Sequence, residues 1–352
     1  MSRAGRSGRV LSAAVYWVLC GAGFLSVAAA VRPLVPLPEE YGLSEKFEHF
    51  AEHKDEYDVV FVGSSHFWRS IIPEVFDREL ALRGHELKSF NFGVGGMRVW
   101  ECHFLVHRML ALRPAKLKWL FVEGGDWDAG FPSEENTFSS RSVYWHDRAE
   151  TAEVIAAVWK QEESLLERLW LSFTHLRLWL WRCSNYGQGR AVLADLRGRA
   201  AVTFGREREE GAYVAGEGFQ TQELLFHPEF KRSLEDFERT VASLEGLNAA
   251  EVDLEQLYLG AMERRDTAAA AQGVQIITLI PPGVEGVAEE LSLYAAGELD
   301  LLFNFNSPDR FPELFRPETR FSPDHLNLTG AREFTHLVAR AFVRHLRGEK
   351  VE

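Results

Sequence analysis

The chain alternates short apolar runs with glycine-ended turns and stretches of helical periodicity. The run at 59–62, rich in β-branched residues, predicts a strand buried on both faces, as in a parallel sheet. Further strands are predicted at 88–92, 119–123 and 274–280. Helices are predicted at 43–57, 73–84, 98–112, 151–183, 230–246, 253–272 and 288–302, with a last helix ending near 346. The order predicts an α/β protein whose sheet is doubly wound and mostly parallel.

The N-terminal segment predicts a membrane anchor. Residues 10–31 carry no charge and are long enough to cross a bilayer as a helix. Arg3, Arg6 and Arg9 precede this run and predict a cytoplasmic N-terminus, with the body in the periplasm or at the cell surface. The alternative is a signal peptide cleaved after residues 28–30. The uncharged run is longer than the usual apolar core of a signal peptide, which favours a single uncleaved helix in the cytoplasmic membrane.

Composition and charge narrow the class of protein. Hydrophobic residues make up 46% of the 352 positions and charged residues 26%, as in a folded globular protein. The formal net charge is −13; the three N-terminal arginines contribute +3 with no acid before residue 32, so the remainder carries −16. A protein region with this negative charge lacks the excess of basic residues that binds nucleic acid. Cys102 and Cys183 are available to pair in an oxidising compartment, but no Cys/His spacing indicates zinc. We expect no metal and no cofactor.

The pattern divides the chain into five parts. They are a cytoplasmic tail (1–9), the anchor (10–31), a linker with a lead-in helix (32–57), an α/β core (58–127 with 266–348) and a helical insertion or cap (128–265). The insertion holds a tryptophan- and leucine-rich helix at 151–183, interrupted by His175 and Arg177, so it is not a second membrane span. We expect it to pack on the core; the alternative is a helix lying at the membrane surface or under a partner.

Small and polar residues follow three of the predicted strands. They are Gly63-Ser64-Ser65, Asn91-Phe92-Gly93-Val94-Gly95-Gly96 and Gly124-Gly125-Asp126. The carboxyl ends of parallel strands meet at one edge of the sheet, where open α/β folds bind ligands. A fourth polar group, His325-Leu326-Asn327 with Gly330, precedes the last helix. The alternative is structural, with serines capping helices and glycines forming turns.

Taken in order, these four blocks resemble the SGNH (GDSL-like) family of esterases and acyltransferases. The resemblance implies that Ser65 is the nucleophile and His325 its base. It also implies an oxyanion hole made by the backbone amides of Ser65 and Gly96, with Asp126 in the place of the family's asparagine. The residue types suit the chemistry, because serine needs a base to take its proton and the oxyanion needs fixed donors.

Two positions depart from the family pattern. Ser322 stands where the family has an aspartate, which leaves Asp324, a backbone carbonyl or a carboxylate from elsewhere to orient His325. Asp126 replaces an oxyanion-hole asparagine, and an ionised carboxylate about 4 Å from an oxyanion costs about 4 kcal/mol at an effective dielectric near 20. Either Asp126 is protonated, or it points away, or the protein is not an efficient ester hydrolase.

Three further residues are candidates for substrate binding. His66 directly follows the predicted nucleophile, Asn91 lies in the second block, and His146 lies early in the insertion, where a cap would reach over the site. For His66 the alternative is a histidine at a helix start. Glu123 and Asp128 are the nearest carboxylates if a metal were present.

The anchor, the SGNH-like body and the insertion together are similar to a bacterial group of membrane-anchored envelope proteins. The group includes D-alanyl-transfer and polysaccharide O-acetylation proteins, which work beside membrane-bound O-acyltransferases. This similarity implies acyl transfer to, or removal from, a cell-envelope polysaccharide or polymer through an acyl-serine. The alternative, favoured by Ser322 and Asp126, is a catalytically inactive assembly or glycan-binding partner of a membrane-bound O-acyltransferase. A third interpretation, a soluble intracellular α/β enzyme, requires that residues 1–31 not enter a membrane.

Overall fold

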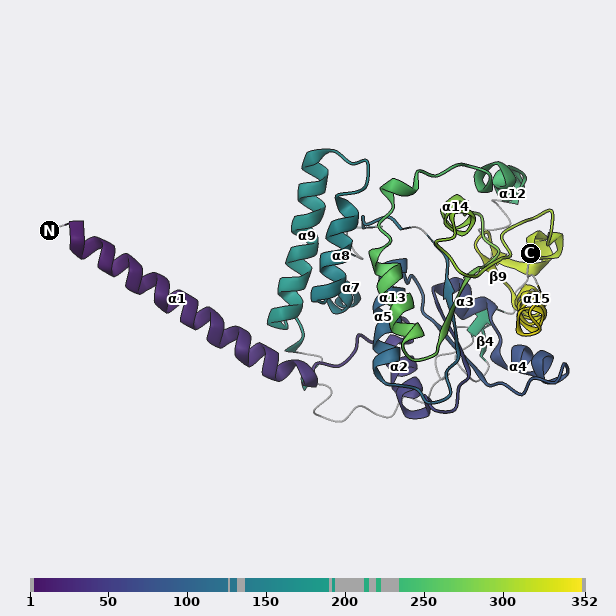
Figure 1. Ribbon diagram of the computed structural model, residues 1–352, viewed down its shortest axis with the longest axis horizontal. Helices are drawn as coiled ribbons and strands as arrows, with labels where there is room; N and C mark the ends of the chain where they lie inside the picture. Colours follow the sequence, from purple (N-terminus) through teal and green to yellow (C-terminus); the bar gives the residue numbers. More distant parts are fainter. Residues whose placement is uncertain are drawn as a thin grey trace. The chain divides into compact units, whose positions relative to one another are not determined.

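The computed structural model describes residues 3–125, 127–131, 137–189, 192–193, 212–214, 220–222 and 234–349 (Figure 1). The chain forms two compact units. The helical unit comprises Met1–Pro38, Gly130–Val158 and Glu163–Ala201, and the α/β unit comprises Glu39–Ala129, Trp159–Glu162 and Val202–Glu352. The lead-in helix and the end of the predicted insertion therefore belong with the sheet, and only part of that insertion joins the anchor segment.

The α/β unit is built on a parallel sheet of five strands, which confirms the predicted α/β class. The strands are β1 (Val59–Gly63), β2 (Ser89–Gly93), β3 (Trp119–Glu123), β6 (Gln275–Ile280) and β7 (Leu302–Asn304), in the order β2-β1-β3-β6-β7. Side chains alternate between the two faces of a strand, and Val59 to Val62 are all fully buried, so both faces of the sheet are covered.

The strand β7 is absent from the sequence prediction. We expected a helix over 288–302, but α14 (Ala288–Ala296) ends at Gly297, whose φ of 82° is the left-handed conformation that glycine adopts at helix ends. The next residues then pair with β6, from Thr278 with Leu302 to Ile280 with Asn304. A strand of three residues is too short to show a pattern of apolar and polar positions by which it could be recognised from the sequence.

Helices of the α/β unit pack against the sheet and against one another. They are α2 (Leu43–His53), α3 (Ser65–Ser70), α4 (Pro73–Ala81), α5 (Val99–Ala111), α12 (Leu234–Asn248), α13 (Gly260–Ala270), α14 and α15 (Leu328–Leu346). On one face Phe61 of β1 stacks on Phe121 of β3 at 4.6 Å, and both rings meet Phe76 of α4 edge-on. Phe342 of α15 closes this cluster, in which α4 and α15 lie side by side (Figure 1).

The remaining described elements of the α/β unit are short. Two antiparallel pairs are present: β4 (Ala212–Val214) with β5 (Gln220–Gln222), and β8 (Arg320–Ser322) with β9 (His325–Leu326). The 3₁₀ turns Glu40–Gly42, Leu254–Gln256, Pro312–Phe315 and Pro317–Thr319 connect larger elements. The β8–β9 pair carries the late histidine.

The helical unit contains α1 (Arg3–Val31), α7 (Ser140–Trp145), α8 (Arg148–Val158) and α9 (Leu165–Ser184), with a 3₁₀ turn at Arg32–Leu34. In the described part of the chain, one helical segment, Val15–Leu34, is long and apolar enough to cross a membrane. The prediction of a single helix at 151–183 is wrong, because α8 ends at Val158 and a separate helix, α9, begins after its N-cap residue Ser164. The Ser164 hydroxyl accepts a hydrogen bond from the Glu167 amide and so caps α9.

Candidate functional site

Ser65 and His325 meet at the carboxyl edge of the sheet, although 260 residues separate them. Ser65 is the first residue of α3, directly after β1, and the Ser64 hydroxyl caps this helix by accepting from the His66 amide at 3.1 Å. His325 lies on β9, which packs against α3. The His325 Nε2 atom is 2.8 Å from the Ser65 hydroxyl oxygen. This is the distance at which a histidine takes a proton from a serine nucleophile.

The other ring nitrogen of His325 contacts Ser322. The Ser322 hydroxyl lies 3.0 Å from His325 Nδ1, because the β8–β9 register places these two residues opposite each other. We had expected Asp324, a backbone carbonyl or a distant carboxylate in this place. Asp324 lies in the turn between the two strands instead.

His325 is a neutral and weak base. Burial, and after it the nearby positive groups His66, Arg69 and Arg320, lower its pKa from 6.5 to about 3. The neutral imidazole is able to accept a proton at pH 7. The Ser322 hydroxyl orients the ring without the negative charge that a carboxylate would contribute.

A histidine–carboxylate pair lies beside Ser65 and His325. Glu123 is the last residue of β3, the strand next to β1. Its carboxylate accepts hydrogen bonds from the Ser64 hydroxyl at 2.8 Å and from the Ser64 amide, and lies 2.9 Å from His66 Nδ1. Glu123 thus holds both residues that flank Ser65. We had considered Glu123 only as a metal ligand, although an acid at the end of the neighbouring strand was a signal for this role.

This pairing changes the charge next to the nucleophile. Burial lowers the pKa of His66, but the hydrogen bond and charge of Glu123, together with the carboxylates Asp324 and Glu285, outweigh burial and raise it above 6.5. The ring centroids of His66 and His325 are 5.2 Å apart. Ser65 is therefore flanked by a weak base and by a histidine that favours its protonated form.

The second block lies beside Ser65 along the same edge. Strands β1 and β2 pair up to Gly63 and Gly93, and the Val94 amide donates to the Gly63 carbonyl at 2.9 Å. Gly96 has a φ of 65°, a conformation that favours glycine, and it is exposed. The predicted oxyanion-hole residue Asp126 lies outside the described residues.

Asn91 is not a substrate-binding residue. Its side chain is fully buried, and the amide nitrogen donates to the carbonyls of Phe67 at 2.8 Å and Ile71 at 2.7 Å. Its carbonyl oxygen accepts from the Gly93 amide at 2.8 Å. These bonds use all of its polar atoms to hold α3 against β2, because a buried amide must be fully hydrogen-bonded.

His146 also differs from its prediction. It lies in the helical unit, fully buried between α7 and α8, and its Nδ1 atom contacts the Ser142 carbonyl. Its Nε2 atom is 2.8 Å from Nδ1 of His175 on α9. Burial and the neighbouring His175 hold the pKa of His146 well below 6.5. Since both ring nitrogens are used within the helical unit, His146 has no polar atom left for a substrate.

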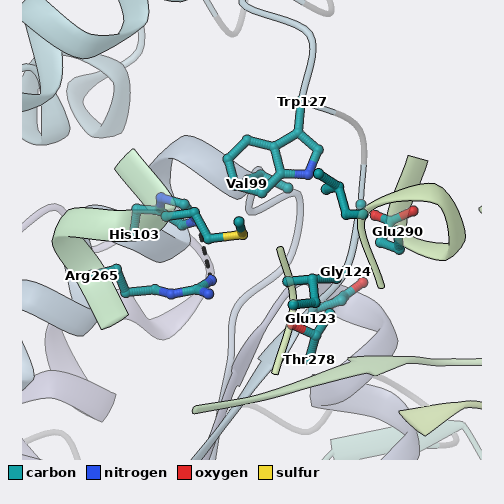
Figure 2. A pocket seen from close by; sticks show the side chains of 12 residues that line it. Val99, His103, Glu123, Gly124, Trp127, Arg265, Thr278 and Glu290 are labelled. Atoms are coloured by element: carbon teal, nitrogen blue, oxygen red, sulfur yellow. Dashed lines mark hydrogen bonds between the residues drawn. The ribbon is translucent and has the colours of Figure 1, made fainter. Parts of the chain in front are cut away.

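Behind Glu123 lies a cavity of about 10 Å³, close to the space that one water molecule needs (Figure 2). His103 and Arg265 line one side, with 3.3 Å between His103 Nε2 and Arg265 Nη1. Glu290 and Thr278 also line it. This space is too small for a substrate. In the described part of the chain no three His, Cys, Asp or Glu residues cluster for a metal ion, and the cysteines form no disulfide there.

The depressed pKa of His325 predicts a loss of stability in acid. Between pH 6.5 and about 3 the unfolded chain binds a proton at this residue and the folded chain does not. The free energy of unfolding should therefore fall as the pH drops below 6.5, by about 1 kcal/mol per pH unit from this residue. The measurement is urea unfolding at pH 4 to 8. Below pH 6, we expect the free energy of unfolding of His325→Gln to fall less steeply with decreasing pH than that of the wild type.

His66→Gln serves as the control, because the shift of His66 has the opposite sign. A raised pKa gives stability that is fully present below 6.5 and lost as the pH rises through the folded value. This variant should keep a clear fall in stability in acid, because burial is the largest cause of the His325 shift, and it should differ from the wild type above pH 6.5. Equal slopes for the wild type and His325→Gln below pH 6 would contradict the depressed pKa of His325.

Compared with known proteins, the chain matches no family model and no curated protein. The site is therefore interpreted from its own geometry.

Proposed function

We propose that this protein is a membrane-anchored serine acyl-transfer enzyme of the SGNH-like type, an O-acyltransferase or esterase. The observation that carries the proposal is the 2.8 Å approach of His325 Nε2 to the Ser65 hydroxyl at the carboxyl edge of a parallel sheet. Counting only the strands of this sheet, the order β2-β1-β3-β6-β7 is 2-1-3-4-5, that of doubly wound, flavodoxin-like folds. In such sheets the ligand site lies where the strand order reverses, which here is next to β1.

In the proposed reaction, His325 takes the proton of Ser65 while the serine oxygen attacks the carbonyl carbon of an acyl ester. The backbone amides of Ser65 and Gly96 stabilise the oxyanion. The intermediate collapses as His325 returns the proton to the leaving alcohol, which leaves an acyl-serine. Water or a sugar hydroxyl then attacks the acyl-serine while His325 takes its proton. The bond between the acyl group and the Ser65 oxygen breaks, His325 returns the proton to Ser65, and the acid or the acylated sugar is released.

The proposed acceptor is a cell-envelope polysaccharide or related polymer. The support is the N-terminal helix, which is apolar over Val15–Leu34 and is preceded by Arg3, Arg6 and Arg9. With the arginines in the cytoplasm, the anchor would hold the α/β unit outside the cytoplasmic membrane, where envelope polymers are found. A membrane-bound O-acyltransferase would be the natural source of acyl groups there.

A second candidate function is a non-catalytic assembly or glycan-binding partner of such an acyltransferase. One observation favours it. The Nδ1 atom of His325 faces the Ser322 hydroxyl rather than a carboxylate, and the pKa of about 3 makes His325 a poor base. Efficient general bases have pKa values near the working pH.

A fluorophosphonate probe separates the two functions, because it reacts only with an activated serine. We expect covalent labelling of the full chain at Ser65, located by peptide mass spectrometry, and no labelling of Ser65→Ala. Heat-unfolded wild type is the control and should stay unlabelled. A folded wild-type protein that remains unlabelled at Ser65 would support the binding function instead.

A further inference from the structure

We infer that the exposed apolar face of α9 lies in the outer surface of the lipid bilayer, beside the anchor; this inference rests on the proposal that α1 spans the membrane. The face is formed by large apolar side chains that are 44% to 80% exposed: Leu165, Leu166, Leu169, Trp170, Phe173, Leu176 and Leu180. Their spacing of three and four residues puts them on one side of the helix. A continuous group of exposed large apolar side chains on a folded protein marks an interaction site.

The opposite side of α9 is already packed. Ser172, Thr174, His175 and Leu178 are buried there, and α9 lies against α7 and α8 (Figure 1). The side chains on this buried side fix the rotation of the helix within the helical unit. The apolar face of α9 therefore points away from the rest of the helical unit.

Two hydrogen bonds place the end of α9 beside the end of the anchor. Arg32 Nη2 donates to the Cys183 carbonyl at 2.8 Å, and Asn185 Nδ2 donates to the Ala28 carbonyl at 2.7 Å. Ala28 and Arg32 lie near the end of the apolar segment Val15–Leu34, where the chain would leave the bilayer. The last turn of α9 is therefore at the membrane surface, and the helix, about 30 Å long in all, extends from that level.

The charges of α9 fit a lipid surface better than a protein partner. The helix carries Arg168, Arg177 and Arg182 against the single acid Glu167, in a chain whose net charge is −13. Arginines beside an apolar face are typical of helices that lie in the interface and meet anionic headgroups. Trp170 is 61% exposed on this face, and tryptophan favours the depth of the headgroups.

The test measures tryptophan fluorescence of the full chain in vesicles of phosphatidylcholine and phosphatidylglycerol. Lipids brominated at shallow or deep acyl positions quench tryptophans that touch the acyl chains. We expect Trp170→Phe to lose part of the quenching, most of it with the shallow bromines. Trp17→Phe, in α1, should lose another part, and Trp119→Phe, in the sheet, should lose none. Phenylalanine keeps each site apolar, so insertion itself is preserved.

The two proposals fail in different ways. If Trp17→Phe reduces the quenching and Trp170→Phe does not, the anchor stands and the membrane face of α9 is overturned. Acrylamide quenching of Trp170 would then show a water-facing helix, and protection from both quenchers would show a protein partner or a second copy. If neither variant changes the quenching, both the anchor and the α9 face are wrong.

Discussion

Replacing Ser65 by alanine should reduce the turnover of an activated acetyl ester by the full-length protein to the uncatalysed rate. Replacing His325 by alanine should lower kcat by about 10²- to 10⁴-fold, the usual contribution of a general base. The reason is the 2.8 Å contact between the two side chains, without which the serine keeps its proton. Steady-state kinetics in detergent, with circular dichroism to confirm folding, would measure both effects.

Asp324→Asn is the matched control for the first prediction. This residue precedes His325 in the same turn, but the Nδ1 atom of His325 faces Ser322. We therefore expect a change in kcat of less than about tenfold, because the charge removed acts on His66 and Arg320 and not directly on His325. If Ser65→Ala kept the wild-type rate, the nucleophile would be wrong. If all proteins including the wild type were inert, the binding function would be the better account.

Replacing Ser322 by aspartate should increase activity. A carboxylate at the position of the hydroxyl, 3.0 Å from Nδ1, would stabilise the protonated ring and raise the pKa of His325 from about 3. Since a base works best with a pKa near the working pH, we expect kcat at pH 7 to rise about 10- to 100-fold. Ser322 is half-buried, and Arg69 and Arg320 nearby would offset the new charge.

The pH profile distinguishes this effect from a general change in packing. A higher pKa for His325 means that the base becomes protonated sooner in acid, so the acid limb of the kcat profile should move to higher pH in Ser322→Asp. Ser322→Ala, which removes the hydroxyl and adds no charge, should lower kcat without this movement. An aspartate variant no more active than the alanine variant would show that the basicity of His325 does not limit the reaction.

The positions of the strands could be predicted from the sequence because each is a local pattern. The apolar runs at 59–62 and 119–123 are strands in the structure, and β3 has the predicted bounds. The carboxyl ends of parallel strands lie at the same edge of a sheet. The proximity of Ser65 to the glycines of residues 91–96 could therefore be predicted from the pattern of strands alone. The late His325 was expected there from the family resemblance.

The partners of these residues depended on the tertiary structure. Asn91 has the polar character of a binding residue, but the packing of α3 on β2 uses all its hydrogen bonds. His146 has the same character, but its pairing with His175 is possible only because α7 and α9 pack together. Neither contact has a signal in the local sequence, because each joins segments that are distant along the chain.

The sequence by itself determined the α/β class, the apolar N-terminal helix and the serine at the end of β1, since these depend on periodicity and on the length of apolar runs. Only the tertiary structure decided which groups hold the two histidines. Ser322 faces His325 through the register of β8 and β9, and Glu123 faces His66 through the adjacency of β3 and β1. The adjacency of β3 and β1 is set by packing over the whole sheet, so no single stretch of residues encodes it. The register of β8 and β9 is set by the short turn between them, but neither of these short strands was expected from the sequence.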